Sequence, residues 1–290
     1  VLLLTHNEEV NLPRCLNALT WCDDVVAVDS GSQDKSLEIM ANFGVRILTR
    51  KFDSFADQRN FGLDTGPFKH EWVLHLDADE VITPEFVDAL NALKPAHEID
   101  AYHVPAKTMF FGKWLRWAGM WPSYQVRLGH RDRLRFKQVG HGQREDLPPE
   151  KLALFSEAYL HFSFSHGLEP WLKKHLRYAR DEVEQIISQR AAPNASPTIT
   201  NGGKVERRRA LKVLFANMPL TLRPFLRFYY IYFARLGFLD GSRGFAYAFM
   251  LAVYEGMIAV IGFEKLGKLS YLDDQQIQSN PPDKTTGRSP

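Results

Sequence analysis

Hydrophobic runs alternate with polar, capped segments over the first hundred residues of the chain. The strand-like runs are VLLLT at 1–5, DVVAVD at 24–29, VRIL at 45–48 and WVLHL at 72–76. The helical segments lie near 12–20, 35–43 and 54–63, with a further one beginning at Thr83. Continuous apolar strands separated by helices are typical of a mostly parallel sheet covered on both faces. The pattern therefore predicts an α/β fold.

Polar residues follow three of these strands directly. They are THNEE at 5–9, DSGS at 29–32 and DAD at 77–79. In parallel sheets, ligands bind beyond the carboxyl ends of the strands, so we expect these residues to share one site. Carboxylates at the end of an apolar strand repel one another unless a cation neutralises them, which a hard divalent ion does. The pattern predicts a carboxylate-rich site for a divalent ion and a diphosphate.

Local structure offers an alternative explanation for each cluster. Asp29 in DSGS suits a turn or a helix cap, and Glu8 and Glu9 suit the start of a helix, where acidic side chains are favourable. An Asp-x-Asp triplet also occurs by chance in solvated loops. These explanations would all have to hold at the same end of one sheet, which favours the shared site.

The composition indicates a globular protein with no overall attraction to nucleic acid. The chain has 290 residues, 45% of them hydrophobic, and a formal net charge of +2. It can bury a full core, and any electrostatic function must come from local clusters of charge. Cys15 and Cys22 are expected to be ordinary thiols in a reducing compartment. Because VLLLT begins inside a strand, we expect further residues before Val1.

Four motifs at these positions point to a family. They are THNEE, VDSGSQD, FADQRNFGL and LHLDADE, in this order. Together they resemble the family 2 glycosyltransferases, inverting enzymes of the GT-A fold that use nucleotide-diphosphate sugars. FADQRNFGL, with GFLDGSRGF near the C-terminus, is similar to the bacterial subgroup of lipopolysaccharide-core and other surface-polysaccharide glycosyltransferases. The resemblance covers roughly residues 1–265 and does not specify the sugar.

The resemblance implies a nucleoside pocket in the donor half of the site. The residues that would line or shape it are Thr5, Asn7, Glu8, Ser30, Gly31 and Asp34. Asp29 would accept a hydrogen bond from the imide N–H of uracil, although guanine also offers such a donor.

The resemblance also implies a site for the diphosphate and a metal. Arg59 and Asn60 would face the donor, where a guanidinium stabilises diphosphate oxygens. An ion pair of Arg59 with Asp57 or Asp64 on the helix surface is the alternative. Two further residues, Asp77 and Asp79, would complete the site. Asp77 would contact ribose or metal, and Asp79 would be the principal ligand of Mg²⁺ or Mn²⁺, which takes up charge on the leaving diphosphate.

Inversion by direct displacement requires a general base for the acceptor hydroxyl. In the family this is an acidic residue downstream of the metal motif, often within a VHE element in the subgroup. This chain instead reads VGHGQREDL at 139–147. We expect Glu145 to be the base, with Asp146 as its competitor and His141 as an orienting or diphosphate-contacting group. A solvated turn before Pro148 is the alternative.

Two nearby patterns leave their roles open. The stretch 110–128 carries three Trp among basic and apolar residues, which suits either sugar stacking or a core. HFSFSH places His161 and His166 on one face of a strand, and no catalytic role is assigned to them.

The composition changes towards the C-terminus. From Lys204 to Lys268 the chain has eleven Lys or Arg against four Asp or Glu, interleaved with aromatic and aliphatic residues. Such segments suit the headgroup region of an anionic bilayer. The stretch 244–263 contains one charge, Glu255, which favours a buried, re-entrant or interfacial helix over a span. A core helix of a soluble protein is the alternative.

We therefore expect a GT-A catalytic domain at 1–188, with the donor site in 1–100 and the acceptor and base region in 101–188. A linker or loop at 189–203, an amphipathic helical membrane-associating segment at 204–270 and a disordered tail at 271–290 would follow. The expected function is a metal-dependent inverting transfer from a nucleotide sugar to a glycan or lipid-linked acceptor. The expected location is the cytoplasmic face of the bacterial inner membrane.

Two other functions are compatible with a nucleotide and a metal on an α/β sheet. A sugar-phosphate nucleotidyltransferase is one, but that class usually carries a Gly-rich loop with a basic residue after its first strand, where this chain has THNEE. A catalytically inactive membrane scaffold with the same fold is the other, and the intact Asp29, Asp77 and Asp79 count against it.

Overall fold

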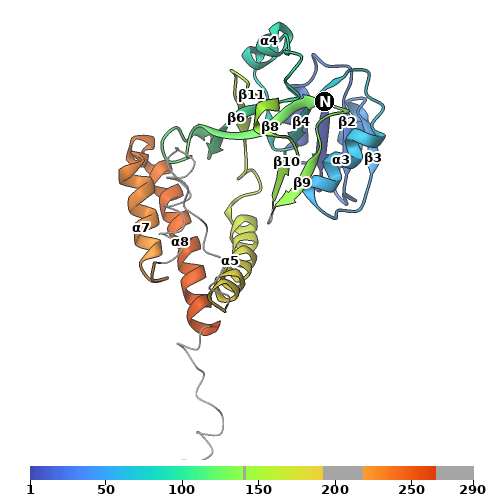
Figure 1. Cartoon of the computed structure of the whole chain (residues 1–290). Coiled ribbons are helices and arrows are strands. Elements are labelled where there is room, and N and C mark those ends of the chain that lie inside the picture. The colour runs from blue at the N-terminus through green and yellow to red at the C-terminus, as the bar shows by residue number, and fades with distance from the viewer. Residues whose placement is uncertain (140–141, 192–217, 266–290) are drawn as a thin grey trace, which may run out of the picture. The chain divides into compact units, whose positions relative to one another are not determined.

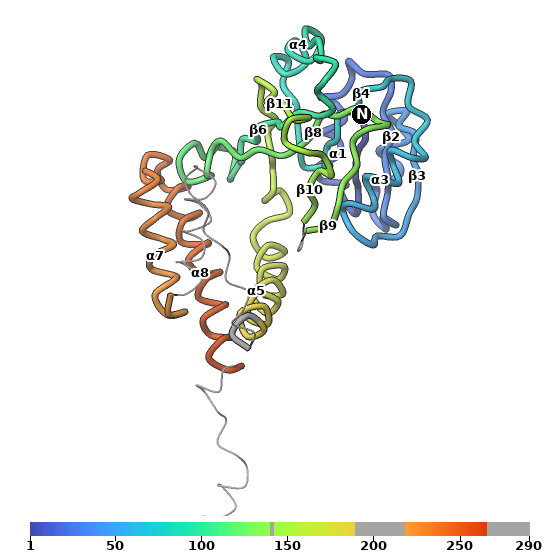
Figure 2. Tube along the Cα trace, in the orientation of Figure 1, coloured from blue at the N-terminus to red at the C-terminus, as the bar shows by residue number. Residues whose placement is uncertain are grey.

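The computed structural model describes residues 1–139, 142–191 and 218–265 (Figures 1 and 2). The chain divides into two compact units, which are described separately. The first unit comprises residues 1–170 and 231–247, and the second comprises 171–230 and 248–290. The expected linker at 189–203 lies almost entirely outside the described residues, and the expected tail at 271–290 lies wholly outside them.

The first unit is built on a mixed sheet, which among the described residues has ten strands. Its strands run in the order β3-β2-β1-β4-β8-β6-β12-β5, and β7 and β11 also pair with β6. Their bounds are β1 (Leu2–Thr5), β2 (Val26–Asp29), β3 (Arg46–Thr49), β4 (Trp72–Asp77), β5 (Glu80–Val81), β6 (Ala101–Phe110), β7 (Lys113–Trp114), β8 (Ser123–His130), β11 (Leu152–Leu154) and β12 (Tyr159–His161).

The register of the first four strands brings their polar ends together. These strands are parallel, with Thr5 opposite Asp29 and Leu4 opposite Asp77. Beyond β4 the sheet becomes mixed, because β8 runs antiparallel to both β4 and β6. The predicted α/β fold class is confirmed, and the purely parallel part is the N-terminal half of the sheet. The clusters after β1, β2 and β4 therefore lie at one edge, as the sequence indicates.

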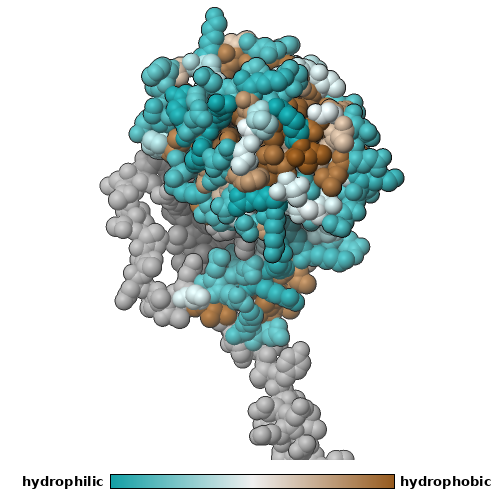
Figure 3. Space-filling model, turned by 90° about the vertical axis from the view of Figure 1, so that its right-hand side faces the viewer, coloured by the Kyte–Doolittle hydropathy of each residue, from teal (hydrophilic) through white to brown (hydrophobic). Residues whose placement is uncertain are grey.

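Helices cover both faces of the parallel strands. They are α1 (Leu12–Asn17), α2 (Ser36–Asn42), α3 (Phe55–Thr65) and α4 (Pro84–Ala92). Leu3 packs in one core cluster with Leu16 of α1, and Leu2 packs in another with Leu63 of α3. This explains why the strands read as continuous apolar runs. The face of the molecule that lies to the right in Figure 1 is hydrophilic around its margin and carries a hydrophobic area in its upper part (Figure 3).

Side-chain caps fix where two of these helices begin. The Ser54 hydroxyl accepts a hydrogen bond from the Asp57 backbone N–H at the start of α3. Thr83 does the same for Phe86 at the start of α4, with Pro84 in the first turn. The predicted start of the helix at Thr83 is thus confirmed.

A hairpin and a C-terminal segment complete the first unit. The strands β9 (Phe136–Val139) and β10 (Gly142–Glu145) pair antiparallel, and the 3₁₀ turn η1 (Pro149–Lys151) follows. Residues 231–247 include most of η2 (Tyr230–Ala234), η3 (Gly237–Asp240) and the start of α8. The buried Asp240 carboxylate accepts hydrogen bonds from three successive backbone N–H groups, those of residues 116–118, at 2.8–3.2 Å. This carboxylate ties the segment to the loop after β7.

The second unit is helical in its described part. Its helices are α5 (Leu168–Ala191), α7 (Arg223–Tyr229) and α8 (Ser242–Lys265), the first and last of which begin in the first unit. Its small core joins Val183 of α5 to Ile258 of α8. The predicted helix at 244–263 is confirmed as part of α8. By length and composition α8 is able to cross a membrane, with a mean hydropathy of 1.7 over a window of which 33% is buried.

Candidate active site

The Asp29 carboxylate organises the loops after β1 and β2. It is fully buried and accepts four hydrogen bonds: from the hydroxyls of Thr5 at 2.9 Å and Ser32 at 2.6 Å, and from two backbone N–H groups, at 2.9 Å from Gly31 and 2.8 Å from Ser32. Gly31 takes a φ of 88°, which L side chains rarely adopt. In this conformation both carboxylate oxygens are occupied. Base binding by Asp29 stays a prediction, and it requires one of these bonds to be exchanged.

The remaining predicted nucleoside residues join the same two loops. The backbone N–H of Asn7 donates to Ser32 Oγ at 2.9 Å, and the N–H of Glu8 donates to Ser36 Oγ at 2.8 Å. Asp34 accepts from the backbone N–H groups of Glu9 and Ser36. Ser30 accepts a hydrogen bond from the Gln58 side chain of α3. The structure thus gathers the predicted residues at one edge of the sheet, where they stabilise the loops.

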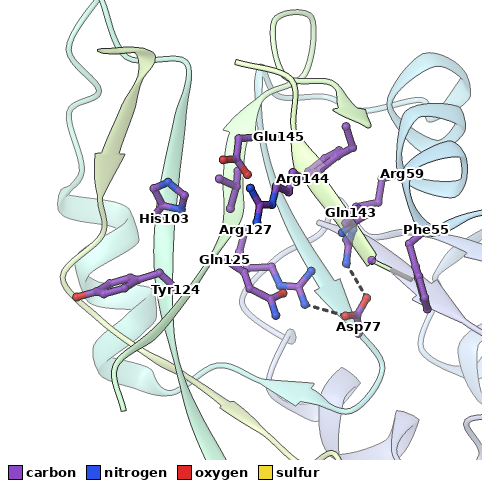
Figure 4. Close-up of a pocket in the computed structure, with 13 residues that line it drawn as sticks. Phe55, Arg59, Asp77, His103, Tyr124, Gln125, Arg127, Gln143, Arg144 and Glu145 are labelled. Atoms are coloured by element: carbon purple, nitrogen blue, oxygen red, sulfur yellow. Dashed lines mark hydrogen bonds and ion pairs between the residues drawn. The ribbon is translucent and has the colours of Figure 1, made fainter. Parts of the chain in front are cut away.

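The Asp77 carboxylate at the end of β4 lies between two buried guanidinium groups (Figure 4). Its Oδ1 is 2.7 Å from Arg59 Nη2, and its Oδ2 is 2.7 Å from Arg127 Nη2. The arginine side chains are only 1% and 2% exposed, and Arg127 also pairs with the buried Glu80. Burial alone would raise the pKa of Asp77, but Arg127 and Arg59 hold it well below its usual range. Arg59 therefore pairs with Asp77 rather than with Asp57 or Asp64.

Part of each guanidinium has no acceptor in the described part of the chain. Nε and Nη1 of Arg59 and Nε of Arg127 are buried and make no hydrogen bond there. Asn60, which we expected to face the donor, bonds instead to the backbone of Phe136, with its amide donating at 2.8 Å and accepting at 2.9 Å. Asn60 positions β9 in this structure, so its contact with the donor stays a prediction.

A cavity of about 510 Å³ opens beside this buried cluster. Its lining includes Arg59, Asp77, His103, Tyr124, Arg127, Gln143, Arg144 and Glu145. In Figure 4, Glu145 lies toward the top of this group and Asp77 toward the bottom. The half-buried Glu145 carboxylate makes no hydrogen bond or ion pair with any other described residue, so it is able to accept a proton from a ligand in the cavity.

The structure separates the two predicted base candidates. Asp146 is exposed, does not line the cavity and pairs with Lys137 at 2.8 Å. Glu145 is the acidic residue of β10 that reaches the cavity. His141, the predicted orienting or diphosphate-contacting group, lies outside the described residues.

Comparison with known proteins identifies the N-terminal half of the chain. Residues 1–142 match the model of the Glycosyl transferase family 2. These residues form a family 2 glycosyltransferase domain. The match agrees with the family that the four motifs of the sequence indicate.

The relatives of this family 2 domain include one protein with a stated process. The lipopolysaccharide core biosynthesis glycosyltransferase of Rhizobium meliloti is 28% identical over 116 residues, which cover 38% of this chain and 42% of that protein. An uncharacterised glycosyltransferase of Rickettsia typhi is 28% identical over 101 residues, or 34% of each protein. The matched region spans only about a third of the length of the Rickettsia relatives.

Solved structures of two other proteins resemble the chain at low identity. Residues 1–349 of S. aureus TarS align with a TM-score of 0.40 and 13% identity, covering 93% of this chain and 91% of that one. Glucosyl-3-phosphoglycerate synthase from Mycobacterium tuberculosis aligns with a TM-score of 0.41 and 16% identity, covering 56% and 71%.

Asp79, which follows β4, and His161, which ends β12, have the side-chain types that could hold the divalent cation implied by the family resemblance. Asp79 Oδ2 lies 3.3 Å from His161 Nε2, and the two side chains are 24% and 27% exposed. Burial lowers the pKa of His161, but the hydrogen bond to Asp79 and the nearby acidic charges raise it to about 9. A carboxylate oxygen is a ligand for first-row divalent metals, and so is an imidazole nitrogen once the incoming cation displaces its proton.

Asp79 and His161 alone would not complete the coordination of a divalent cation, so further ligands would have to come from a bound substrate. The described residues contain no cluster of three or more His, Cys, Asp or Glu arranged for a metal. The other predicted ligand, Asp77, has both oxygens engaged by arginines. Sites with one or two protein ligands are typical of ions that are held jointly with substrate phosphates.

The loop after β12 connects several of these elements. Its His166 Nε2 lies 3.2 Å from Glu8 Oε2, and Phe162 carries the Arg14 guanidinium 3.6 Å above its ring. Further along the loop, Phe164 packs edge-on against Phe110, with ring centroids 4.9 Å apart. The loop thus contacts the segment after β1, helix α1 and the end of β6.

Sequence reasoning missed two residues of the site, Arg127 and His161. Arg127 stands at a polar position of the alternating YQVRL, where an exposed side chain is expected, so the local pattern gives no sign that it is buried. His161 stands in HFSFSH, where the alternation was recognised but no role was assigned. In both cases the residue type was visible, but the acidic partner lies far away in the sequence.

Proposed function

We propose that the chain is a metal-dependent inverting hexosyltransferase. It would move a sugar from a nucleotide-diphosphate sugar, with UDP-sugars as the favoured class, to a glycan or lipid-linked acceptor in bacterial surface-polysaccharide assembly. The family 2 domain and the lipopolysaccharide-core relative support this class of reaction. The observation that carries the proposal is that Asp77 of the strand-end motif and the free carboxylate of Glu145 line one cavity.

On the donor side, the buried arginines supply fixed positive charge. The N–H groups of Arg59 and Arg127 that have no acceptor in the described part of the chain support binding of diphosphate oxygens. Asp77 holds both guanidinium groups in place, so their orientation is set before a ligand arrives. Asp79 and His161 would hold the divalent cation, which when bound takes up negative charge on the leaving diphosphate.

On the acceptor side, Glu145 acts as the general base. The acceptor oxygen forms a bond to the anomeric carbon of the sugar while the bond from that carbon to the nucleotide diphosphate breaks. The hydroxyl proton passes to the Glu145 carboxylate, and the configuration at the carbon inverts. Tyr124 and His103 line the same cavity and are able to contact the acceptor.

A screen of nucleotide sugars tests this function. UDP- and GDP-sugars are incubated with the protein and Mn²⁺ or Mg²⁺, and release of the nucleoside diphosphate is measured. We expect release from one donor class, dependent on the metal and abolished by Asp79→Ala. The matched control Asp132→Ala removes an exposed carboxylate outside the site and should leave release unchanged. Release that is independent of metal and of Asp79 would contradict the proposal.

We also propose that the protein works at the cytoplasmic face of the bacterial inner membrane, as a peripheral or re-entrant protein. The apolar helix α8 and the basic, aromatic composition of 204–268 support this location. A lipid-linked acceptor would be presented at the same surface.

A further inference from the structure

Exposed hydrophobic side chains gather in the first unit outside the candidate active site. They come from the turn between β6 and β7 and from residues 231–247. Six of them, each 39–56% exposed, define what we call the aromatic platform: Phe111, Phe233, Leu236, Phe238, Leu239 and Phe245. Large apolar side chains that are exposed together, rather than singly, mark an interaction surface.

Aromatic contacts show that the platform is continuous. The ring of Tyr232 lies 5.1 Å from that of Phe233, 6.3 Å from that of Phe238 and 5.6 Å from that of Phe245. Three platform residues from η2, η3 and the start of α8 therefore surround one tyrosine. Phe111 is tied to the start of α8, since the Arg243 side chain donates from Nε to the carbonyl oxygen of Phe111 at 2.9 Å.

The platform is also held in place by buried polar contacts. Asp240 is 4% exposed and bonds to the three backbone N–H groups of residues 116–118. A buried carboxylate saturated by backbone donors fixes the segment 237–240 against the loop after β7. The exposed rings thus stand on a rigid support.

The charges around the platform have one sign. Residues 107–121 and 231–247 contain five Lys or Arg, and their one acidic residue is the buried Asp240. Exposed aromatics bordered by cations match the headgroup region of an anionic bilayer, where rings sit at the interface and cations meet phosphates. A two-fold contact between copies of this chain would instead place these cations against one another.

We propose that the aromatic platform rests on an anionic lipid bilayer. The inference rests on the proposed membrane location and is independent of the proposed reaction. It assigns the contact to a surface that includes the turn after β6, whereas the sequence indicates only the segment 204–270. The rings of the platform enter the headgroup layer, and Lys113 and Arg116 lie beside the lipid phosphates.

Flotation of the full chain tests the proposal. Vesicles of phosphatidylcholine alone are compared with vesicles of equal parts phosphatidylcholine and phosphatidylglycerol. Phe238→Ser with Leu239→Ser should weaken binding to the anionic vesicles by at least about tenfold, because both side chains leave the interface. The matched control Phe43→Ser with Leu154→Ser changes two side chains that are 41% and 66% exposed outside the platform and should bind unchanged.

A second pair of variants tests the charges. Lys113→Gln with Arg116→Gln should weaken binding by about 25-fold at low salt, since each cation near an anionic surface contributes about fivefold. The difference should shrink as salt rises. Lys35→Gln with Lys94→Gln, two exposed lysines outside the platform, is the control. Thermal unfolding of every variant shows whether it is folded.

A measurement on the unchanged chain needs no variant. The Trp117 backbone N–H donates to Asp240 at 3.0 Å, and Arg235 donates to the Trp121 carbonyl oxygen at 3.1 Å, so both tryptophans adjoin the segment 231–247. Brominated lipid in anionic vesicles should therefore quench tryptophan fluorescence. Absence of quenching and flotation, or equal binding by platform and control variants, would overturn the proposal.

Self-association that the platform variant abolishes, with flotation unchanged, would identify a second copy as the occupant instead. None of these measurements reads sugar transfer, so their failure leaves the proposed reaction standing.

Discussion

Asp79 and His161 meet at 3.3 Å, although one follows β4 and the other ends β12. The pairing of β12 with β5 produces this contact, because the register sets His161 opposite Glu80, the residue after Asp79. The sheet itself therefore positions a carboxylate and an imidazole side by side.

Removal of the imidazole should weaken metal binding. We expect His161→Ala to lower the Mn²⁺ affinity, measured by calorimetry with a nucleoside diphosphate present, by more than about tenfold, since even supporting side chains are worth about 10–100-fold. His166→Ala is the matched control, because this histidine of the same loop contacts Glu8 instead. Equal affinities of the two variants would exclude His161 as a ligand.

Neutralising the proposed base should slow transfer without loss of the donor. Glu145→Gln is expected to lower kcat by about 10²–10⁴ while the donor KM changes little. Asp146→Asn should change kcat by less than about fivefold, because this exposed carboxylate only pairs with Lys137. Steady-state kinetics of both variants decide the assignment, and a large effect in Asp146→Asn alone would transfer the role.

The buried charge cluster should be sensitive to loss of its central cation. Arg127→Met leaves the fully buried Glu80 without its cation and the 32%-exposed Asp77 with Arg59 alone, so we expect the free energy of unfolding to fall by about 3–5 kcal/mol. The control Lys137→Met breaks a pair to Asp146 in which both side chains are more than half exposed, and should lower it by less than about 1 kcal/mol. Urea unfolding followed by circular dichroism measures the free energy of unfolding of both variants. If both lose the same amount, the buried cluster contributes no more to stability than an exposed ion pair.

Asp240 should stabilise the first unit through its backbone contacts. Asp240→Ala leaves three N–H groups without their acceptor, and we expect a loss of about 3 kcal/mol. Asp240→Asn keeps one acceptor oxygen and should lose less. The exposed Asp132 provides the control as Asp132→Ala, which should unfold at the same urea concentration as the unchanged chain. An Ala variant that matches this control would show that the contacts contribute little.

Local sequence patterns were sufficient to predict most helices and strands in the N-terminal half of the fold. The predicted run at 72–76 became β4, and the predicted cap at Thr83 opens α4, because periodicity and capping depend on neighbouring residues. The strand-end clusters could be placed at one edge because parallel strands share their direction. These features follow from short-range physics alone.

Contacts between distant strands could not be predicted in this way. Arg127 reaches Asp77 only because β8 inserts beside β4, antiparallel to it, and no local pattern specifies that neighbour. Likewise, the amide of Asn60 is turned to β9 by the backbone of Phe136. The sequence showed the residue types of the site, while the order of the strands decided their partners.

The loop from Phe162 to Gly167 has a consequence for the position of the acceptor. Phe164 packs against Phe110, next to Phe111 of the platform, while the same loop begins directly after His161. A bilayer on the platform would therefore set a fixed height for the chemistry above the lipid. An acceptor held in the same bilayer would have to present its hydroxyl group at that height.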